Sequence, residues 1–377
     1  MTKNSMVVEM KLAMTMMVRD EADIVSAMLD HHLAQGVDTI IVTDNGSIDG
    51  TAEILGDYAS RGLIDLRHDP VQRKQQNIVV TQMAREAKAR YDADWVINAD
   101  ADEFVIPVDR SMTLRDALEH TPKSIRSFSV PVVNLTGDPA LSGTGFERLV
   151  WRDTRPDDIL RLVGLWAQPT HNAVHVGDAD VVVAQGNHFV SLSSRGAPDD
   201  AHAIEVLHLP WRSWNQFRNK VEISGRAYES NPELLPSPNH HGMRDYRRLK
   251  DGVLLPYYVL RHPSADELSA GTASNQYQHD DYLARTLTSA VADVPLGDAE
   301  LAPHRAMIDV LQDLTGTATA TLRGRNNLIR LLTDHRDSLD DRVRLLEAEV
   351  AELRQSFGNR AYAALQRLRL RLRTGNK

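Results

Sequence analysis

Apolar and polar residues alternate in blocks over the first hundred positions of the chain. Some apolar blocks are short and end in polar clusters, whereas others carry an apolar residue at every third or fourth position. The first kind predicts buried strands and the second predicts amphipathic helices. The expected strands are residues 12–18, 39–47, 63–69 and 94–100, and the expected helices are residues 21–36, 49–62 and 71–90. This alternation predicts an α/β fold with a mostly parallel sheet and flanking helices.

Polar side chains gather where each expected strand ends. The carboxyl ends of parallel strands meet at one edge of a sheet, and ligands bind outside that edge. We therefore expect one site to be built from four separate loops. Its polar residues are Arg19, Asp20 and Glu21 after the first strand, Asp44 and Asn45 after the second, His68 and Asp69 after the third, and Asp100 and Asp102 after the fourth.

The pattern loosens after residue 110. Residues 127–133 and 178–184 are expected to be short strands, and residues 211–230 a helix. Helices joined by loops are expected over residues 231–303, which are rich in Pro, His and Asp. The expected organisation is a first domain of residues 1–230, a helical and loop extension of residues 231–325, and a C-terminal helix of residues 326–377.

A heptad pattern runs along the C-terminal helix. Apolar residues step by three and four positions, with Arg336 as the polar exception. They are Ile329, Leu332, Leu339, Val343, Leu346, Val350, Leu353 and Phe357. About four heptads are near the minimum for a coiled coil, and Val at position a with Leu at position d favours two strands. The segment is therefore either a homodimeric coiled coil or an amphipathic helix that packs back on the domain.

The charge balance excludes one class of function and sets the C-terminus apart. A net charge of −9 at pH 7 argues against a nucleic-acid binder, which needs a basic face for phosphates. Residues 357–377 nevertheless hold five arginines, one lysine and no acidic side chain. Near an anionic membrane each Arg contributes about 1 kcal/mol, so peripheral membrane contact is one interpretation. A basic oligomerisation helix and a disordered tail are the alternatives.

The remaining composition indicates the compartment. The chain has no cysteine, which excludes a disulfide framework and thiolate metal sites. Its first residues lack a clean signal peptide, and no run of about 18 apolar residues is present. We expect a cytoplasmic protein whose basic tail contacts the inner face of the membrane if it contacts a membrane at all.

Asp100 and Asp102 form a D-x-D motif at the end of the fourth strand. Residues i and i+2 of an extended segment point to the same side, so both carboxylates can reach one cation. Hard oxygen ligands suit Mn²⁺ or Mg²⁺, which keep positions open for a diphosphate. Such a metal stabilises the charge that grows on a departing diphosphate, and this chemistry predicts glycosyl transfer from a nucleotide-sugar donor. A solvated acidic turn is the alternative.

Three stretches of the sequence resemble glycosyltransferase family 2, in the subgroup that has a D-x-D-E-F motif. They are "MMVRDEADIVSAMLDHHLAQGVDTIIVTDNGSIDGT", "DWVINADADEFV" and "VLHLPWRSWNQFRNKV". The likeness spans roughly residues 12–230. Two departures touch the nucleotide pocket: Asp20 stands where the family usually has Asn, and Thr43-Asp44-Asn45 stands where many members have Asp-Asp-Gly.

The resemblance implies a GT-A fold, an inverting reaction and a set of roles. It places Glu21, Asp44 and Asp69 against the nucleoside, Asp100 against the ribose or the metal, and Asp102 on the metal. A UDP-sugar is the favoured donor, and a glycan, a glycolipid or another hydroxyl compound the acceptor. Apart from the resemblance, Glu21 can simply favour a helix N-terminus, and Asp44 can simply belong to a turn.

The later block supplies a histidine and two cations. By its place in the resemblance, His208 is the third metal ligand, and a neutral imidazole is able to bind such an ion. Arg212 and Lys220 are suited to hold phosphate oxygens. Arg19 of the first cluster is a further expected contact to the nucleotide-sugar donor. His208 is otherwise a core histidine, and His188 is its rival as a ligand or else a contact to the acceptor.

The transfer also needs a base for the proton of the acceptor hydroxyl. Glu147 is the expected base, chosen over Asp153, Asp157 and Asp158 of the same middle region. Two other functions compete with sugar transfer. A nucleotidyltransferase would want a glycine-rich, lysine-containing phosphate loop, which is missing. A coiled-coil assembly protein with a degenerate transferase domain is disfavoured by the intact motif residues.

Overall fold

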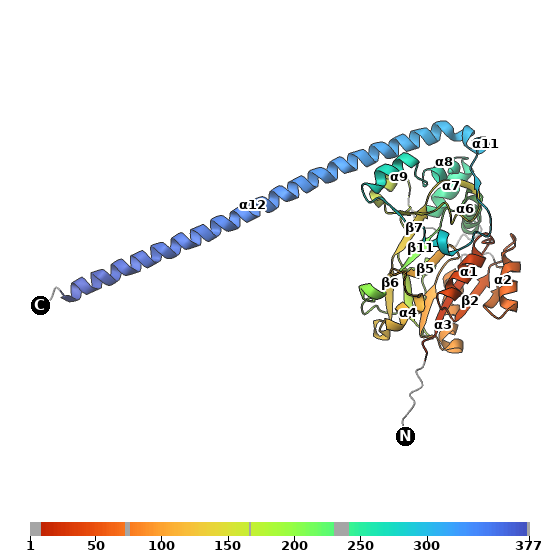
Figure 1. Ribbon diagram of the computed structural model, residues 1–377, viewed down its shortest axis with the longest axis horizontal. Helices are drawn as coiled ribbons and strands as arrows, with labels where there is room; N and C mark the ends of the chain where they lie inside the picture. Colours follow the sequence, from red (N-terminus) through yellow and green to blue (C-terminus); the bar gives the residue numbers. More distant parts are fainter. Residues whose placement is uncertain (1–8, 72–75, 166, 230–240, 375–377) are drawn as a thin grey trace, which may run out of the picture. The chain divides into compact units, whose positions relative to one another are not determined.

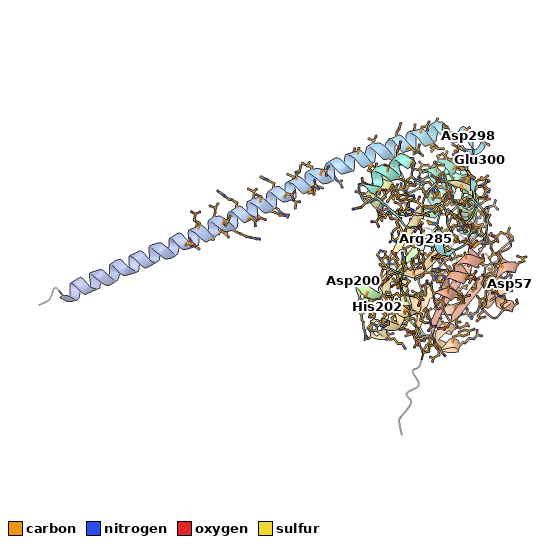
Figure 2. All side chains as sticks on the ribbon, in the orientation of Figure 1. Asp57, Asp200, His202, Arg285, Asp298 and Glu300 are labelled. Atoms are coloured by element: carbon orange, nitrogen blue, oxygen red, sulfur yellow. The ribbon has the colours of Figure 1, made fainter. Side chains whose placement is uncertain are left out.

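The structure, a computed structural model, describes residues 9–71, 76–165, 167–229 and 241–374. The chain divides into two compact units, residues 1–315 and residues 316–377. Sheets and helices of the first unit pack with side chains filling the space between them (Figures 1 and 2).

A six-stranded sheet forms the centre of the N-terminal half, in the order β3-β2-β1-β4-β10-β6. The first four of these strands are parallel, and β10 is antiparallel to its neighbours. The strands are β1 (Leu12–Val18), β2 (Thr39–Asp44), β3 (Asp65–His68), β4 (Trp95–Asn98), β6 (Ser127–Val130) and β10 (Asn172–Val176). Val18, Asp44 and His68 are in register, so the ends of β1, β2 and β3 form one edge.

Helices cover both faces of this sheet. They are α1 (Val25–Ala34), α2 (Thr51–Ser60) and α3 (Gln76–Tyr91). Leu12, Met14 and Met16 of β1 belong to the same apolar cluster as α1, whereas Ala13 packs with α3. A strand that is buried on both faces has no polar alternation, which is why β1 reads as a continuous apolar run. The predicted α/β class, with a mostly parallel sheet and flanking helices, is confirmed.

A second sheet continues from the first through the acidic motif. Its strand order is β12-β9-β7-β11-β5. The strands are β5 (Glu103–Pro107), β7 (Val132–Thr136), β9 (Trp151–Asp153), β11 (Ile204–His208) and β12 (Tyr277–His279). The chain passes from β4 of the first sheet to β5 of the second through a turn at residues 99–102. In the pairing of β11 with β5, His208 lies opposite Glu103, which brings the later motif block beside the acids.

Shorter elements complete the first unit. The helices are α4 (Leu114–His120), α5 (Asp157–Leu162), α6 (Trp214–Glu229), α7 (His241–Lys250), α8 (Leu254–Val259), α9 (Ala265–Thr272), α10 (Tyr282–Thr286) and α11 (Asp298–Leu301), and the strands β8 (Ala140–Ser142) and β13 (Val294–Pro295) pair with each other. Helices α5 to α8 and the beginning of the last helix share a second apolar core. The apolar residues that are scattered between positions 157 and 311 pack together in this core.

Two local predictions are wrong. Residues 178–184 form no strand, and only an isolated bridge joins Val183 to Val190. Val181 and Val183 are buried against α3 instead. Their apolar character therefore reflects side-chain packing and not the hydrogen-bond pairing of a β-sheet. The D-x-D motif is not extended either. Glu103 N donates to Asp100 O at 3.1 Å and closes a turn, because the chain must cross from one sheet to the other there.

The last helix, α12 (Arg305–Thr374), confirms the predicted C-terminal helical region, but it begins at Arg305 and not at the expected residue 326. Ile308 and Leu311 near its start are buried in the first unit. Within the second unit, the heptad residues from Ile329 to Val350 are exposed. Leu353, Phe357 and the basic tail lie outside the residues whose side chains the structure describes, so the expected membrane contact stays a prediction. None of the helices in the described residues is both long and apolar enough to span a bilayer.

Candidate functional site

The acidic turn is held closed by its own residues. Asp100 N donates to Glu103 Oε2 at 3.0 Å, in addition to the backbone bond between these two residues. Leu209 N, directly after β11, donates to Asp102 O at 2.9 Å. The turn, β5 and the end of β11 are therefore fixed to one another, and the Asp102 side chain is fully buried between them.

A cavity of about 200 Å³ opens beside this turn. The end of β1, the turn itself, the start of α3 and one face of α6 form its wall. The charged lining residues are Arg19, Asp20, Glu21, Asp100 and Lys220, and Gln76 is among the uncharged polar ones. Ile223 of α6 also lines it. Two of the predicted loop clusters and the later motif block thus meet at one place.

Cations surround Asp102. Lys220 Nζ lies 2.7 Å and Arg212 Nη1 3.9 Å from its Oδ2 atom, and His208 Nε2 lies 3.7 Å from Oδ1. Burial would raise the pKa of Asp102, but Lys220 and His208 outweigh burial and hold this pKa well below its usual range. The Lys220 side chain is 44% exposed, with its ammonium group turned onto the carboxylate. Asp102 is therefore an anion in the folded protein.

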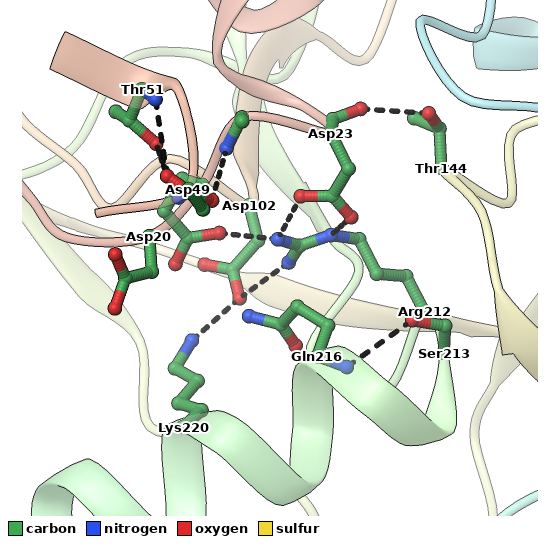
Figure 3. Close-up of polar contacts among 12 residues, drawn as sticks. Asp20, Asp23, Asp49, Thr51, Asp102, Thr144, Arg212, Ser213, Gln216 and Lys220 are labelled. Atoms are coloured by element: carbon green, nitrogen blue, oxygen red, sulfur yellow. Dashed lines mark hydrogen bonds and ion pairs between the residues drawn. The ribbon is translucent and has the colours of Figure 1, made fainter. Parts of the chain in front are cut away.

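Arg212 connects this carboxylate to the end of β1 (Figure 3). Its guanidinium is fully buried and binds Glu21, and its Nε donates to Asp23 Oδ2 at 2.6 Å. Burial raises the pKa of Glu21 to about 7 although Arg212 opposes that shift. Arg212 Nη1 and Asp102 Oδ1 are buried atoms for which no hydrogen-bond partner is found in the described part of the chain. Buried polar atoms are rarely left unpaired, so both point to a missing ligand.

Asp102 and His208 fit a divalent cation. Asn134 Nδ2 donates to Ala167 O at 2.6 Å, so Asn134 Oδ1 is the atom that accepts from His208 Nδ1, at 2.9 Å. In the neutral ring Nε2 then carries the lone pair, and this atom lies 3.7 Å from Oδ1 of Asp102. Burial would lower the pKa of His208, but Asp102 raises it above its usual range, so a metal bound here would replace a proton on Nε2. Two ligands that each lie about 2.1 Å from one ion are at most about 4.2 Å apart. The described residues offer this pair and no group of three or more His, Asp or Glu ligands.

Asp100 faces the cavity but is held by amides. Its Oδ1 accepts from Gln76 Nε2 at 2.7 Å and from Asn187 Nδ2 at 3.2 Å. Burial raises the pKa of Asp100, and the neighbouring Asp102 raises it further. The prediction that Asp100 and Asp102 share one cation therefore remains a proposal.

Asp44, Asp69 and Glu147 do not line the cavity. Asp44 accepts from Ser47 N at 3.1 Å and lies 2.9 Å from His68 Nδ1, so it fixes the turn after β2. Asp69 Oδ1 accepts from Val71 N at 3.1 Å. Glu147 is exposed. Their predicted roles stay predictions, whereas Arg19, Glu21, Asp100 and Lys220 are brought together at the cavity, with Asp102, His208 and Arg212 next to it.

Sequence reasoning missed Asp23, Asn134 and Asn172. Asp23 stands two positions after Glu21, but only the fold shows that both bind one arginine. Asn134 and Asn172 come from strands without a motif, and their amides orient His208 and contact Glu103. No spacing in the sequence connects these asparagines to the acids.

The comparison with known families defines the class of protein. The sequence profile of glycosyltransferase family 92 matches residues 12–150, from β1 through the acidic turn to the start of β9. The chain is a glycosyltransferase. The more specific assignment to family 2 is not confirmed. Among curated proteins, none matches the chain.

Solved structures show only a distant likeness to this chain. The crystal structure of S. aureus TarS 1-349 shares 11% identity over 64% of this chain and 72% of that chain, with a TM-score of 0.31. In complex with UDP, the same TarS fragment matches 84% of this chain and 92% of that chain at 11% identity, with a TM-score of 0.32. Glucosyl-3-phosphoglycerate synthase from Mycobacterium tuberculosis, solved with Mn²⁺, UDP and glucosyl-3-phosphoglycerate, shares 18% identity over 44% of this chain and 57% of that chain, at a TM-score of 0.23. Likenesses this weak carry nothing about donor or acceptor.

Proposed function

We propose that the protein moves a sugar from a nucleotide-sugar donor to an acceptor hydroxyl in a metal-dependent, inverting reaction on a GT-A type domain. One observation supports this most. Oδ1 of Asp102, which has no hydrogen-bond partner among the described residues, lies 3.7 Å from Nε2 of His208, next to a cavity that Lys220 lines. An anion, an imidazole and an ammonium group together suit a divalent metal with a diphosphate.

Each predicted residue takes a role in this proposal. Asp102 and His208 would hold Mn²⁺ or Mg²⁺, and Asp100 would face the ribose or the same metal. When bound, the metal would neutralise the charge that grows on the departing diphosphate. Lys220, which lines the cavity, would bind phosphate oxygens through charge-assisted hydrogen bonds. Arg212, next to the cavity, would supply Nη1, which has no hydrogen-bond partner among the described residues.

The nucleoside would bind at the end of β1. Arg19 and Glu21 line the cavity there, and burial keeps the pKa of Glu21 near 7, so that it can accept or donate a hydrogen bond. Asp44 and Asp69 belong to the next loops of the same sheet edge and remain the proposed outer contacts. Uridine diphosphate is the first nucleotide to test. The acceptor would be a glycan, a glycolipid or another hydroxyl compound.

The deciding experiment measures thermal stability with nucleotides. UDP, GDP, CMP and dTDP are added one at a time, each with and without Mn²⁺, to the wild-type chain and to Asp102→Asn. A ligand at 100 times its Kd adds about 2.7 kcal/mol to the stability of the folded state. One nucleotide should raise the midpoint only with Mn²⁺, and Asp102→Asn should lose this rise. If no nucleotide has any effect, the donor site is refuted and an assembly protein with a degenerate domain becomes the better interpretation.

We further propose that α12 forms a parallel dimer with a second copy of the chain. In the heptad frame, Leu332, Leu339 and Leu346 occupy position d, and Val343 and Val350 occupy position a. Between residues 335 and 347, positions g are then His335 and Arg342, whereas positions e are Asp340 and Glu347.

The charges at these positions select the orientation of the two helices. In a parallel pair each g residue faces the e residue five positions further along its partner, so Arg342 would meet Glu347. An antiparallel pair would instead set these basic positions against basic ones and the acidic against acidic. Apolar heptad side chains that are 45–59% exposed in one copy would be covered by the other.

A further inference from the structure

A chain of three hydrogen-bonded side chains lies behind the acidic turn, and the roles proposed above do not use it. Asn172 of β10 donates from Nδ2 to Glu103 Oε2 at 2.8 Å. His188, which directly follows the short 3-10 helix η2 (Gln185–Asn187), has its Nδ1 atom 3.2 Å from Asn172 Oδ1. Glu103 and Asn172 are buried, whereas His188 is only partly buried. A carboxylate and an amide thus support an imidazole that solvent reaches.

The amide fixes the tautomer of this imidazole. Since Asn172 Nδ2 donates to Glu103, the Oδ1 atom of the same amide must accept, and Nδ1 of His188 must carry the hydrogen. Nε2 is then left with its lone pair. Burial lowers the pKa of His188, so the ring is neutral at neutral pH. A neutral imidazole whose Nδ1 donates and whose Nε2 carries the lone pair is the form that accepts a proton in catalysis.

The turn before His188 is fastened to the cavity wall. Gln185 Nε2 donates to Gln76 Oε1 at 2.6 Å, and Asn187 Nδ2 donates to Asp100 Oδ1 at 3.2 Å. Gln76 and Asp100 are both cavity-lining residues. The charged and titratable groups that face His188 electrostatically are Asp100 and His208, from the two motif blocks. His188 therefore lies beside the place where the donor would bind.

Gly186 makes room for the ring. Its φ is +77°, and a Cβ atom built there would lie 2.9 Å from His188 Nε2. A side chain at this position would both strain the turn and push against the imidazole. The turn is thus shaped so that the ring of His188 can lie over it.

The geometry points to His188 as the general base of the transfer, with Asn172 and Glu103 as its positioning residues. This inference rests on the proposed function. Nε2 takes the proton of the acceptor hydroxyl while the acceptor oxygen forms its bond to the anomeric carbon. The bond from that carbon to the diphosphate oxygen breaks, and its electron pair leaves with the nucleoside diphosphate. Glu147, the base expected from the sequence, is exposed. Neither Glu147 nor His188 is a cavity-lining residue, but the turn before His188 is hydrogen-bonded to the lining residues Gln76 and Asp100.

The test uses water as the acceptor, so that the natural acceptor need not be known. The probes are the glucose, galactose and N-acetylglucosamine derivatives of whichever nucleotide stabilises the chain, and release of the nucleoside diphosphate is measured. His188→Gln should slow this release about 100-fold or more, the usual contribution of a general base. It should keep the Mn²⁺-dependent rise in midpoint given by the nucleotide. His120→Gln, an exposed histidine of α4, is the matched control and should change neither quantity.

A positioning variant adds a second readout. Asn172→Ala should slow release while leaving the nucleotide-dependent midpoint in place, and the pH at which release reaches half its maximum should move together with the rate. If His188→Gln releases the nucleoside diphosphate at the wild-type rate, the inference is overturned. It is also overturned if this variant no longer binds the nucleotide. A wild-type chain that binds a nucleotide but releases none from the three donors also counts against it, since such a base would activate water. If no nucleotide binds, the proposed function itself fails, and this result is distinguishable from the others.

Discussion

The cavity and the C-terminal helix depart from the usual arrangement of a folded chain in opposite ways. At the cavity, charge is buried: Arg212 and Asp102 are both 0% exposed. Along α12, apolar surface is open: Leu332 is 59% and Leu346 49% exposed. A buried charge and an exposed apolar stripe are the two observations that ordinary packing does not explain. Under the proposals above the two regions take partners of different kinds, since one would bind an anionic ligand with a metal and the other an apolar helix.

This difference between the cavity and α12 predicts that substitutions in the two regions have different effects. Changes at the cavity should alter folding stability and ligand binding, because its charges compensate one another inside the first unit. Changes in the helix should alter association and leave the first unit alone. The predictions below are arranged from the largest expected effect to the smallest.

Arg212→Leu should lower the free energy of unfolding by about 3–5 kcal/mol, the usual cost of removing one partner of a buried ion pair. Glu21 and Asp23 would lose their common cation in a place that water barely reaches. Urea unfolding followed by tryptophan fluorescence measures the change. Arg61→Leu is the matched control, because Arg61 is 55% exposed and pairs with Asp57 on the protein surface. Asp57 is labelled in Figure 2. A loss below about 1 kcal/mol at Arg212 would show that the network is not needed for folding.

Leu346→Asp should turn a dimer into a monomer while the unfolding midpoint of the first unit stays constant. Position 346 is at the proposed helix seam, where a buried carboxylate is not tolerated. Sedimentation velocity reports the mass. Leu345→Asp is the matched control, because Leu345 is 67% exposed and sits at an outward heptad position. A wild-type chain that is monomeric at all concentrations would refute the dimer.

The orientation of the helices is tested by cysteine crosslinking. The chain has no cysteine, so an introduced cysteine is the only thiol that can form a disulfide. Leu346→Cys should form an interchain disulfide on mild oxidation if the helices are parallel, and Leu345→Cys should not. Arg342→Glu should weaken association, and the double change Arg342→Glu with Glu347→Arg should restore it. Equal crosslinking at both positions would indicate non-specific contact.

Lys220→Met should leave the chain folded and remove most of the nucleotide-dependent rise in midpoint. Its side chain is 44% exposed, so the free protein loses little, but the cavity loses the ammonium group proposed for the diphosphate. Arg218→Met, on the exposed side of α6, is the control and should behave as wild type. If Lys220→Met binds the nucleotide as tightly as wild type, Lys220 serves Asp102 alone.

The sequence predicted the parallel half of the fold well because its rules are local. Buried parallel strands read as apolar runs, and Gly36, with φ +87°, ends α1 where the pattern stops. The site was only partly predictable. Glu21, Asp100, Asp102 and Lys220 stand in motifs, but the pairing of β11 with β5 places His208 beside Asp102.

Features that depend on tertiary contact alone escaped prediction. Val181 and Val183 were predicted to belong to a strand because their sequence is rich in valine. They are buried against α3 without strand pairing, and such burial favours the same apolar residues as a buried strand does. No sequence pattern marks Asn172 or Asn134 as part of the site. The role of each amide becomes visible only when its two hydrogen-bond partners are known from the fold. The heptad of α12 is the reverse case. Its pattern is plain in the sequence, and only a second chain would show what it contacts.

The last prediction concerns a single proton, through the pH dependence of stability at Glu21. Burial raises the pKa of Glu21 from 4.5 to about 7, so the folded state holds a proton that the unfolded chain releases. The stability gained from this group is fully present below about pH 4.5 and is lost as pH rises through 7. In Glu21→Gln the dependence is absent. The wild-type chain should therefore lose stability relative to the variant between pH 4.5 and about 8, by about 1.4 kcal/mol for each pH unit that separates the folded and unfolded pKa values.

The difference between the two chains isolates Glu21 from histidines that titrate with the opposite sign. Burial lowers the pKa of His31 and His175 to about 4, so both chains lose the same stability as pH falls below 6.5. A difference that stays flat from pH 4.5 to 8 would mean that Arg212 keeps Glu21 ionised throughout. The cavity would then offer the nucleoside a fixed anion, and the end of β1 would accept hydrogen bonds but never donate one from this side chain.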